Sequence, residues 1–88
     1  MQFEWDENKA RSNKAKHRVD FESVRDFDFD TAFYTMDDAI DHGEDRWRAT
    51  GLIGLRLYTL VFTERENRIR VISLRRATLV EMKDFYER

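Results

Sequence analysis

The stretch VISLRRAT, residues 71–78, joins an apolar run to two adjacent arginines and then to the start of a helix. Its first four residues favour a buried strand, whereas Arg75 and Arg76 need water or a charged partner. Thr78 and Glu81 form a capping-box pattern, in which each side chain accepts a hydrogen bond from a backbone N–H of the first turn. The stretch therefore predicts a strand that ends at the rim of a sheet, beside a capped helix.

The segments before this stretch predict an antiparallel meander. Alternating apolar residues and turn residues give hairpins around Ile53-Gly54 and Glu66-Asn67. The expected strands are Ala32–Met36, Arg46–Leu52, Arg56–Glu64 and Arg68–Leu74. The last two are apolar on both sides, so we expect them at the centre of the sheet, covered by helices.

The N-terminal part predicts a short strand, Gln2–Trp5, and a helix, Glu7–His17, capped by Asp6. This helix has almost no apolar stripe, so neighbouring elements must hold it in place. Arg18 follows the helix at a position where a left-handed residue is expected, and a residue other than glycine takes that conformation at some cost.

A second helix is predicted to begin at Asp20, with a hydrophobic staple between Val19 and Val24 and an apolar side formed by Phe21, Val24 and Phe27. The closing helix is expected to bury Leu79, Met82 and Tyr86, with Phe85 beside them. The whole chain, residues 1–88, is thus expected to be one α+β domain. It would have two N-terminal helices and one C-terminal helix packed on a small curved sheet.

Composition excludes several classes of function. The chain has no cysteine, its three glycines do not form a nucleotide-binding pattern, and its two histidines are 25 positions apart. We therefore expect no metal and no cofactor. The N-terminus lacks the basic and apolar regions of a signal peptide, and no apolar run is long enough to span a bilayer. A cytoplasmic protein with no membrane association is expected.

Charge is divided unevenly along the chain. Residues 1–45 contain six Lys/Arg and thirteen Asp/Glu, whereas residues 46–88 contain ten and five. Such asymmetry suggests an acidic face and a basic face, of which the basic one can meet a polyanion. The alternative is that folding mixes the charges in space.

The arginines of the last two strands are the main candidates for chemistry. Arg65, Arg75 and Arg76 lie near strand ends, where guanidinium groups can hold a phosphodiester and stabilise the negative charge of its transition state. Register decides which of them cluster. A two-residue turn at Glu66-Asn67 places Arg65 on one face with Arg70 and Arg76, whereas a longer loop places it with Arg75. The other interpretation is that these arginines form surface ion pairs with Glu64, Glu66 and Asp84.

Other side chains allow two interpretations as well. Lys9, Lys14, Lys16 and His17 can line a nucleic-acid groove or form an ordinary solvated helix face. His17 and Glu44 can carry protons, since histidine titrates near neutrality. Trp47 and Tyr58 can stack on a base, although an aromatic residue in a strand more often belongs to the core.

In their order along the chain, five motifs resemble the BrnT family of toxins. They are FEWDENKARSNKAKH (3–17), VDFE (19–22), HGEDRW (42–47), VFTER (61–65) and VISLRRAT (71–78) with Glu81. The resemblance spans nearly the whole chain. Two residues depart from the family pattern: Arg18 stands where glycine is usual, and Leu74 replaces a small residue.

The resemblance implies a RelE-like, metal-independent ribonuclease toxin of a type II toxin–antitoxin pair. Its partner would be a BrnA-like antitoxin that dimerises, binds operator DNA and represses its own promoter together with the toxin. Two toxins and two antitoxins would form the complex, and the toxin would reach operator DNA only through its partner. We further expect acidic residues of segment 20–45, including Asp37, Asp38 and Asp41, to steer a basic segment of that partner.

The family motifs fall on Lys16 to Val19, Gly43 to Arg46, Thr63 to Arg65 and Ile72 to Thr78. The implied reaction is attack of an RNA 2′-hydroxyl on the adjacent phosphate. Arg65, Arg75 and Arg76 are expected to hold that phosphate, while Glu44, Glu64 or His17 move protons. The residues expected to bind RNA are Lys9, Lys14, Arg46 and Thr78. A catalytically inactive module that only binds the antitoxin, or a nucleic-acid adaptor without toxin activity, would use the same arginines.

Overall fold

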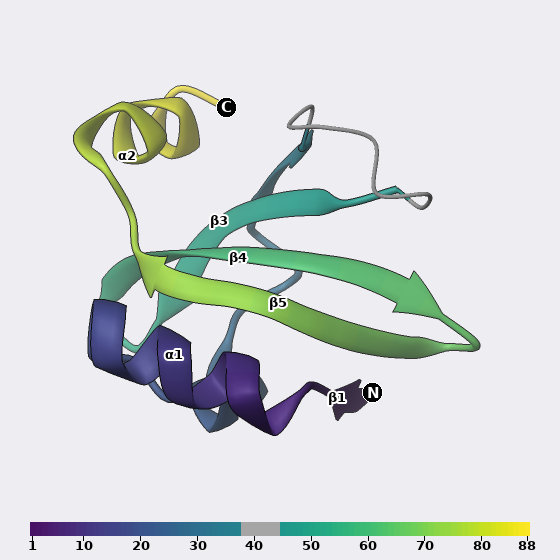
Figure 1. Cartoon of the computed structure of the whole chain (residues 1–88). Coiled ribbons are helices and arrows are strands. Elements are labelled where there is room, and N and C mark those ends of the chain that lie inside the picture. The colour runs from purple at the N-terminus through teal and green to yellow at the C-terminus, as the bar shows by residue number, and fades with distance from the viewer. Residues whose placement is uncertain (38–44) are drawn as a thin grey trace.

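Five strands form one sheet, in the order β1-β5-β4-β3-β2, in the computed structural model, which describes residues 1–37 and 45–88 (Figure 1). The strands are β1 (Gln2–Glu4), β2 (Phe33–Met36), β3 (Trp47–Ile53), β4 (Arg56–Arg65) and β5 (Arg68–Arg76). The helices are α1 (Glu7–His17), the 3₁₀ helix η1 (Phe21–Asp26) and α2 (Leu79–Tyr86).

The predicted α+β class and the antiparallel meander β2–β5 are confirmed. The whole sheet is mixed, because β1 pairs in parallel with β5 beside this meander. Phe3 of β1 lies opposite Ile69 of β5, so the N-terminal strand closes the edge of β5 nearest the β4–β5 turn.

The caps predicted for the two N-terminal helices are confirmed for the first helix and absent from the second. Asp6 caps α1 by accepting a hydrogen bond from the N–H of Asn8 at 2.8 Å, and Arg18 takes the expected left-handed conformation with φ 62°. The second helix is a 3₁₀ helix, and Asp20 makes no side-chain cap. The Asp20 carboxylate instead lies 3.0 Å from Nζ of Lys14, so it contributes to an ion pair rather than to helix initiation.

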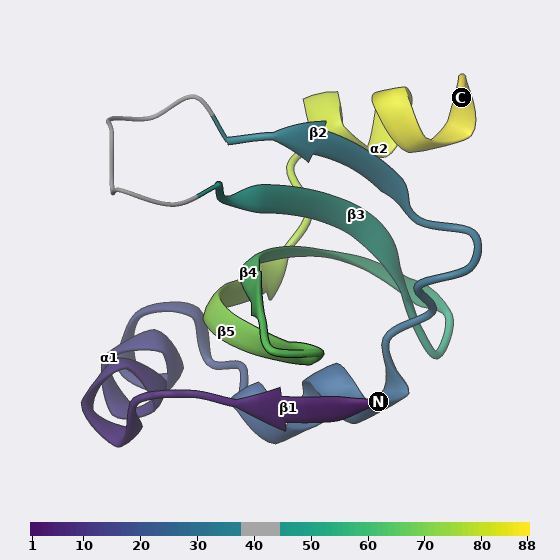
Figure 2. The same cartoon turned by 90° about the vertical axis from the view of Figure 1, so that its right-hand side faces the viewer.

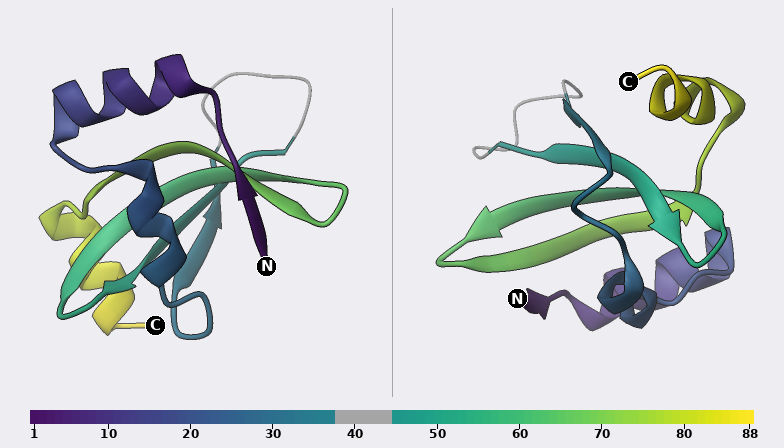
Figure 3. Two further views of the ribbon diagram at one scale, coloured as in Figure 1. Left: turned by 90° about the horizontal axis from the view of Figure 1, so that it is seen from below. Right: turned by 180° about the vertical axis from the view of Figure 1, so that it is seen from behind.

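The helices cover the two faces of the sheet unequally. Helices α1 and η1 lie on one face, which we call the helix face, and α2 lies over one end of the other face (Figures 2 and 3). The main core is on the helix face and combines both helical segments with the central strands. Its buried residues are Val19, Phe21, Val24, Phe27, Ala49, Leu60, Phe62, Ile69, Val71 and Leu74.

Helix α2 buries a different stripe from the one predicted. Phe85 is 4% exposed and packs with Leu57 and Ala77, whereas Leu79 is 83% and Tyr86 72% exposed. The reason is Glu81, whose carboxylate accepts hydrogen bonds from Thr59 and Arg75 of the sheet. Residues 82 and 85 lie on the same side of the helix as Glu81 and therefore face the sheet as well.

A β-bulge divides β5 into two halves. Phe62 of β4 pairs with Val71, but Val61 pairs with Ser73, so Ile72 is an extra residue on β5. Because side chains alternate along a strand, one extra residue reverses the alternation. Ile69, Val71 and Leu74 consequently all face the main core.

Turn geometry confirms the shorter β4–β5 loop. Arg65 pairs with Arg68, and both turn residues, Glu66 and Asn67, have positive φ, as a two-residue hairpin turn requires. The β3–β4 turn is shifted by one residue from the prediction, because Ile53 pairs with Arg56 and leaves Gly54 and Leu55 in the turn.

A buried amide side chain holds α1 against the sheet. Nδ2 of Asn13 donates to the carbonyl oxygens of Leu74 at 2.8 Å and Val19 at 3.1 Å, and Oδ1 accepts from the N–H of Leu74 at 3.2 Å. The side chain thereby pairs with β5 as another strand would. This explains how a helix without an apolar stripe stays in place.

We expect Asn13→Ala to lower the free energy of unfolding by about 2–4 kcal/mol, because three hydrogen bonds are lost and backbone groups of Leu74 and Val19 lose their partner. Urea unfolding followed by circular dichroism measures the change. Ser12→Ala, at an exposed position of the same helix, is the control and should cost less than about 0.5 kcal/mol. Equal effects of the two changes would contradict this role.

Candidate functional site

Five arginines share the sheet face opposite the main core. We call this surface the arginine face, and its members come from β3, β4 and β5. They are Arg48, Arg65, Arg68, Arg70 and Arg75. The bulge at Ile72 places Arg75 with Arg65 and Arg70, an arrangement that neither predicted register contained. The basic half of the chain therefore does form a basic face.

Carboxylates partly neutralise this face. Glu4 of β1 bridges two arginines, at 3.1 Å from Arg68 and 3.2 Å from Arg70. Asp37 lies 3.1 Å from Arg48. Since one carboxylate serves both Arg68 and Arg70, each guanidinium keeps further N–H donors for another anion.

The centre of the arginine face contains polar atoms that are buried without a partner. Among the residues that the structure describes, Nε of Arg46, Nε of Arg48 and Oγ1 of Thr63 have no hydrogen-bond partner. Arg46 immediately precedes β3, and Thr63 pairs with Arg70 on the same face. Buried donors without acceptors are costly, so the two arginines favour an anionic ligand at this point.

Arg75 is held by the first turn of α2. Its two terminal nitrogens donate to Glu81, at 2.8 Å to Oε1 and 2.9 Å to Oε2. Thr59 and the N–H of Thr78 donate to the same carboxylate at 2.8 and 2.9 Å. Burial alone would raise the pKa of Glu81, but these hydrogen bonds, from Arg75 above all, lower it to about 2.

This network gives Glu81 and Thr78 structural roles. Glu81 is ionised at neutral pH and cannot carry protons there. Thr78 forms the predicted capping box, since its hydroxyl accepts from the N–H of Glu81. Its side chain and N–H are therefore both used within the protein.

A basic notch of about 210 Å³ lies between α1 and β5. Its lining residues are Lys9, Ser12, Asn13, Lys16, His17, Ile72 and Ser73. Burial lowers the pKa of His17, and the positive charges of Lys16 and Arg75 lower it further. His17 is thus largely neutral at pH 7 and can accept a proton. Ser73 belongs to the arginine face, so the α1–β5 notch continues that surface.

The structure does not bring the three expected phosphate-holding arginines together. Arg65 and Arg75 share a face, but Arg75 pairs with Thr59, six positions before Arg65 on β4. At about 3.3 Å per residue the two are roughly 20 Å apart. Arg76 is on the helix face, where its guanidinium lies 5.7 Å from the ring of Tyr58.

Several other candidates are also separated from this surface. Glu64 pairs with the core residue Ile69 and therefore points to the helix face. Lys14 lies 3.0 Å from Asp20, apart from the lysines of the notch. Trp47 and Tyr58 pack against the main core, as the structural interpretation predicted. Glu44 is outside the described residues.

The interpretation of the arginines as ion-pairing residues is partly right. Glu66 is 3.8 Å from Arg68, as expected. The shorter pairs involve Glu4, Asp37 and Glu81, none of which was predicted. Of these, Glu4 is far from its partners in the sequence, whereas Glu81 is six positions from Arg75. The sequence nonetheless contains a local signal for the arginine face. Arginine and apolar residues alternate strictly over residues 68–71, and the next polar and apolar residues, Ser73, Leu74 and Arg75, are displaced from that alternation by one residue, Ile72.

The described residues, 1–37 and 45–88, contain neither a metal-binding cluster nor a membrane-spanning helix. No group of three or more histidine, aspartate or glutamate side chains is arranged to hold a metal ion. No helix within these ranges has the length and apolarity needed to cross a membrane.

The family model of the ribonuclease toxin BrnT, of type II toxin–antitoxin systems, matches residues 5–81. The match includes β3, β4, β5 and the capping box of α2, and so covers every arginine of the arginine face. No curated protein matches the chain significantly.

The Glu81 network predicts a stability that depends on pH. The carboxyl pKa is about 2 in the folded protein against 4.5 ordinarily, so the stabilisation is complete above pH 4.5 and is lost as pH falls towards 2. Glu81→Gln should lower the free energy of unfolding at pH 7 by about 1–3 kcal/mol and flatten this acid dependence. Glu87→Gln, at the exposed end of α2, is the matched control. Urea unfolding between pH 3 and 7 measures both, and an unchanged acid slope in Glu81→Gln would contradict the assignment.

Proposed function

The chain belongs to the BrnT family of ribonuclease toxins of type II toxin–antitoxin systems, and from this we propose that it cleaves RNA without a metal ion and is neutralised by a BrnA-like protein antitoxin. The observation that supports cleavage is the arginine face, on which five guanidinium groups gather from three strands. Phosphate is the ligand for which several arginines on one surface are best suited. Cytoplasmic RNA is the proposed substrate.

RNA would lie along the arginine face, from the β4–β5 turn to the α1–β5 notch. Arg65, Arg68 and Arg70 would hold phosphates at one end, with Arg46 and Arg48 at the middle of the sheet. Lys9 and Lys16 would hold the strand at the notch. The length of β5 between Arg68 and Arg75 matches several nucleotides rather than one, which accounts for the spread of the arginines.

The scissile phosphate would lie at the notch, where Arg75 is close enough to His17 for its positive charge to lower the pKa of the imidazole. Neutral His17 would accept the proton of the 2′-hydroxyl, whose oxygen then attacks phosphorus. The bond from phosphorus to the 5′-oxygen breaks, and that oxygen leaves with a proton from an acid. The products are a 2′,3′-cyclic phosphate and a 5′-hydroxyl end.

The Glu81 carboxylate would orient Arg75 so that its remaining donors face the non-bridging oxygens of the phosphate. Glu44, two positions before Arg46, is the proposed second proton carrier. Glu64 and Arg76 receive no catalytic role, because they point to the helix face.

A second candidate function is supported by the same ion pair. Because both terminal nitrogens of Arg75 are bonded to Glu81, the arginine face is also compatible with an inactive module that only binds the antitoxin and helps it repress its promoter. Such a module would bind RNA weakly and leave it intact. In either case we propose a complex of two toxins and two antitoxins that reaches operator DNA through the antitoxin.

Cleavage of purified RNA in EDTA tests the proposal. The parent protein should cut, and Arg75→Ala should reduce the rate constant by about 10²–10³, because one of the groups that stabilise the transition state is lost. Arg76→Ala should cut at a rate close to that of the parent, since its side chain is on the other face. Arg56→Ala, in the β3–β4 hairpin, removes the same charge and is the control.

Variants are compared only where their circular dichroism and unfolding midpoints match the parent, because Arg75→Ala leaves Glu81 without its main partner. Equal loss in Arg75→Ala and Arg76→Ala would contradict the role of the arginine face. Absence of cleavage by the parent, both on free RNA and on translating ribosomes, would favour the inactive module.

The pH dependence of cleavage tests His17. Its pKa is lowered from 6.5, so the rate constant should rise as pH rises through that lowered value and become level above it. His17→Asn should lower the rate constant by about 10²–10⁴ and remove this rise. His42→Asn, which changes the other histidine of the chain, is the control. A full pH rise in His17→Asn would assign the proton transfer to another group.

A further inference from the structure

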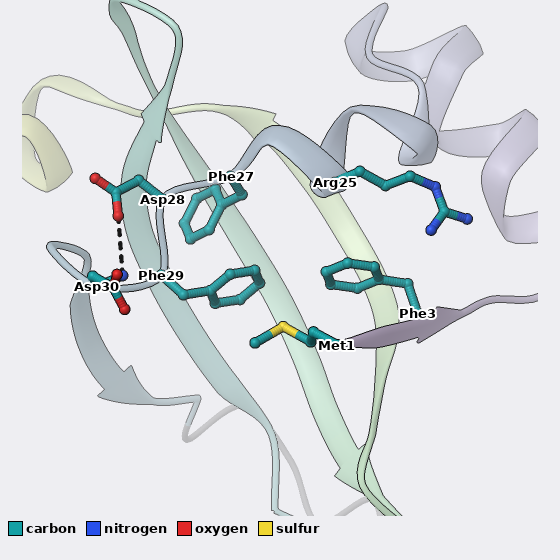
Figure 4. Close-up of a pocket in the computed structure, with 7 residues that line it drawn as sticks. All are labelled: Met1, Phe3, Arg25, Phe27, Asp28, Phe29 and Asp30. Carbon is teal, nitrogen blue, oxygen red and sulfur yellow. Dashed lines mark hydrogen bonds between the residues drawn. The ribbon is translucent and has the colours of Figure 1, made fainter.

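The sheet has a second distinctive surface, on the opposite side from the arginine face. A groove of about 460 Å³ lies between β1 and the segment that leads into β2, on the helix face. We call it the aromatic groove, and its lining residues are Met1, Phe3, Arg25, Phe27, Asp28, Phe29 and Asp30 (Figure 4). Its volume is in the range of sites that bind organic groups.

Aromatic rings form the floor of the groove. The rings of Phe3 and Phe29 stack with centroids 6.0 Å apart, and Phe27 packs edge-on against Phe29 at 4.9 Å. In Figure 4 the three rings follow one another across the sheet, with Asp28 and Asp30 at one end and Arg25 at the other. Both Phe3 and Phe29 are only partly buried, so apolar surface is offered to a ligand.

The aromatic groove is fixed in place before any ligand binds. The N–H of Asp28 donates to the carbonyl of Leu52 at 2.9 Å, and Phe27 bridges to Ile53 of β3. Gly51 allows this close approach, because a Cβ there would lie 2.7 Å from the ring of Phe27. A rigid groove loses little entropy when it binds a partner.

The groove is acidic at the end of its rim formed by Asp28 and Asp30, and Arg25 lies at the other end (Figure 4). The segment DFDFD, residues 26–30, alternates aspartate with phenylalanine, and residues 20–37 contain six acidic residues and one arginine. Burial raises the pKa of the nearby Tyr34 phenol, and the carboxylates of Asp30, Asp28 and Glu64 raise it further. Negative potential therefore extends from Asp28 to the β4–β5 hairpin.

Apolar surface continues along the edge strand β2. Tyr34 donates its hydroxyl hydrogen to the carbonyl of Phe29 at 2.7 Å, and Met36 pairs with Trp47 further along the strand. Tyr34 and Met36 are 41% and 42% exposed and point to the same face as the groove. A strip of this length suits an extended or helical peptide better than a small molecule.

We propose that the aromatic groove and this strip are the docking site for a basic segment of the antitoxin, which places an apolar side chain on Phe3 and Phe29 and a Lys or Arg against Asp28 and Asp30. The inference rests on the proposed toxin role only in taking a protein antitoxin as the partner. It assigns the antitoxin an anchor on the face opposite the one that binds RNA.

Charge favours a basic peptide in the aromatic groove over RNA and over a second copy of the chain. RNA would be repelled by the aspartates of the rim. A second copy of the chain in a symmetric dimer would place two acidic grooves against each other, which is unfavourable. If the second copy instead placed its arginine face in the groove, the contact would be head-to-tail, and such contacts need not form a closed assembly. A basic peptide gains both the apolar contact and the opposite charge.

The test is a charge reversal at the rim. Asp30 is exposed, and Asp30→Lys should weaken binding of the co-expressed cognate antitoxin at least about tenfold in 0.05 M salt. Salt screens charges over about 10 Å at 0.1 M, so the difference should shrink at 0.5 M. Asp84→Lys, on α2 over the other face, makes the same charge change and should have a smaller effect. Isothermal titration calorimetry measures affinity, and RNA cleavage by Asp30→Lys should match the parent.

The chain's three methionines give a second readout. Met1 lines the groove and Met36 lies on the strip, so their ¹³C-methyl resonances should shift when antitoxin is added. Unshifted Met1 and Met36 resonances with antitoxin bound, or equal weakening by Asp30→Lys and Asp84→Lys, would overturn the proposal. Tighter RNA binding by Asp30→Lys with unchanged antitoxin affinity would assign the surface to RNA, and loss of self-association would assign it to a second copy. Failure of cleavage leaves these binding results intact, so the two proposals fail separately.

Discussion

The division of the sheet into two chemically different faces depends on the bulge at Ile72. Without the extra residue, strict alternation along β5 would place Leu74 and Arg75 on the opposite faces from those they occupy. Leu74 would leave the main core and the guanidinium of Arg75 would enter it, which is too costly for a charged group. The bulge thus permits Ile69, Val71 and Leu74 to be buried while Arg68, Arg70 and Arg75 remain on one polar surface.

Two side chains fix the elements on either side of this irregular strand. Asn13 pairs with the backbone of Leu74 and ties α1 to the edge of β5, and Glu81 binds Arg75 and ties α2 to the sheet. Both contacts fall within the second half of β5, directly after the bulge. Polar groups can hold this part of the structure because each is satisfied by several partners in a partly buried setting.

A sheet with one basic and one acidic, aromatic surface suits a protein that must meet two kinds of partner. The arginine face repels a basic peptide and the aspartates of the aromatic groove repel RNA, so charge directs the two partners to different faces. An anchor on the helix face would also leave the rest of an antitoxin able to reach around the edge of the sheet towards the arginines. Linking two contacts through one chain raises affinity without a stronger individual contact.

The sequence by itself determined the elements that local chemistry controls. The Thr78–Glu81 capping box, the Asp6 cap, the left-handed Arg18, the Glu66-Asn67 turn and the meander all follow from residue types at short range, and all are present. The same holds for the charge asymmetry, because it is a property of the order of charged residues along the chain. The five motifs that resemble the BrnT family also lie in the linear sequence, and the family match over residues 5–81 confirms the resemblance.

Tertiary structure decided which side of the sheet each candidate occupies. The bulge forms because non-local packing of Leu74 against the main core outweighs regular pairing, and no local pattern measures that balance. The partner Glu4, the amide of Asn13 and the parallel pairing of β1 depend on contacts between segments far apart in the sequence, up to 66 positions for Glu4 and Arg70. Such contacts are fixed by packing of the whole chain, which is why Arg75 and Arg76, adjacent in VISLRRAT, belong to opposite surfaces.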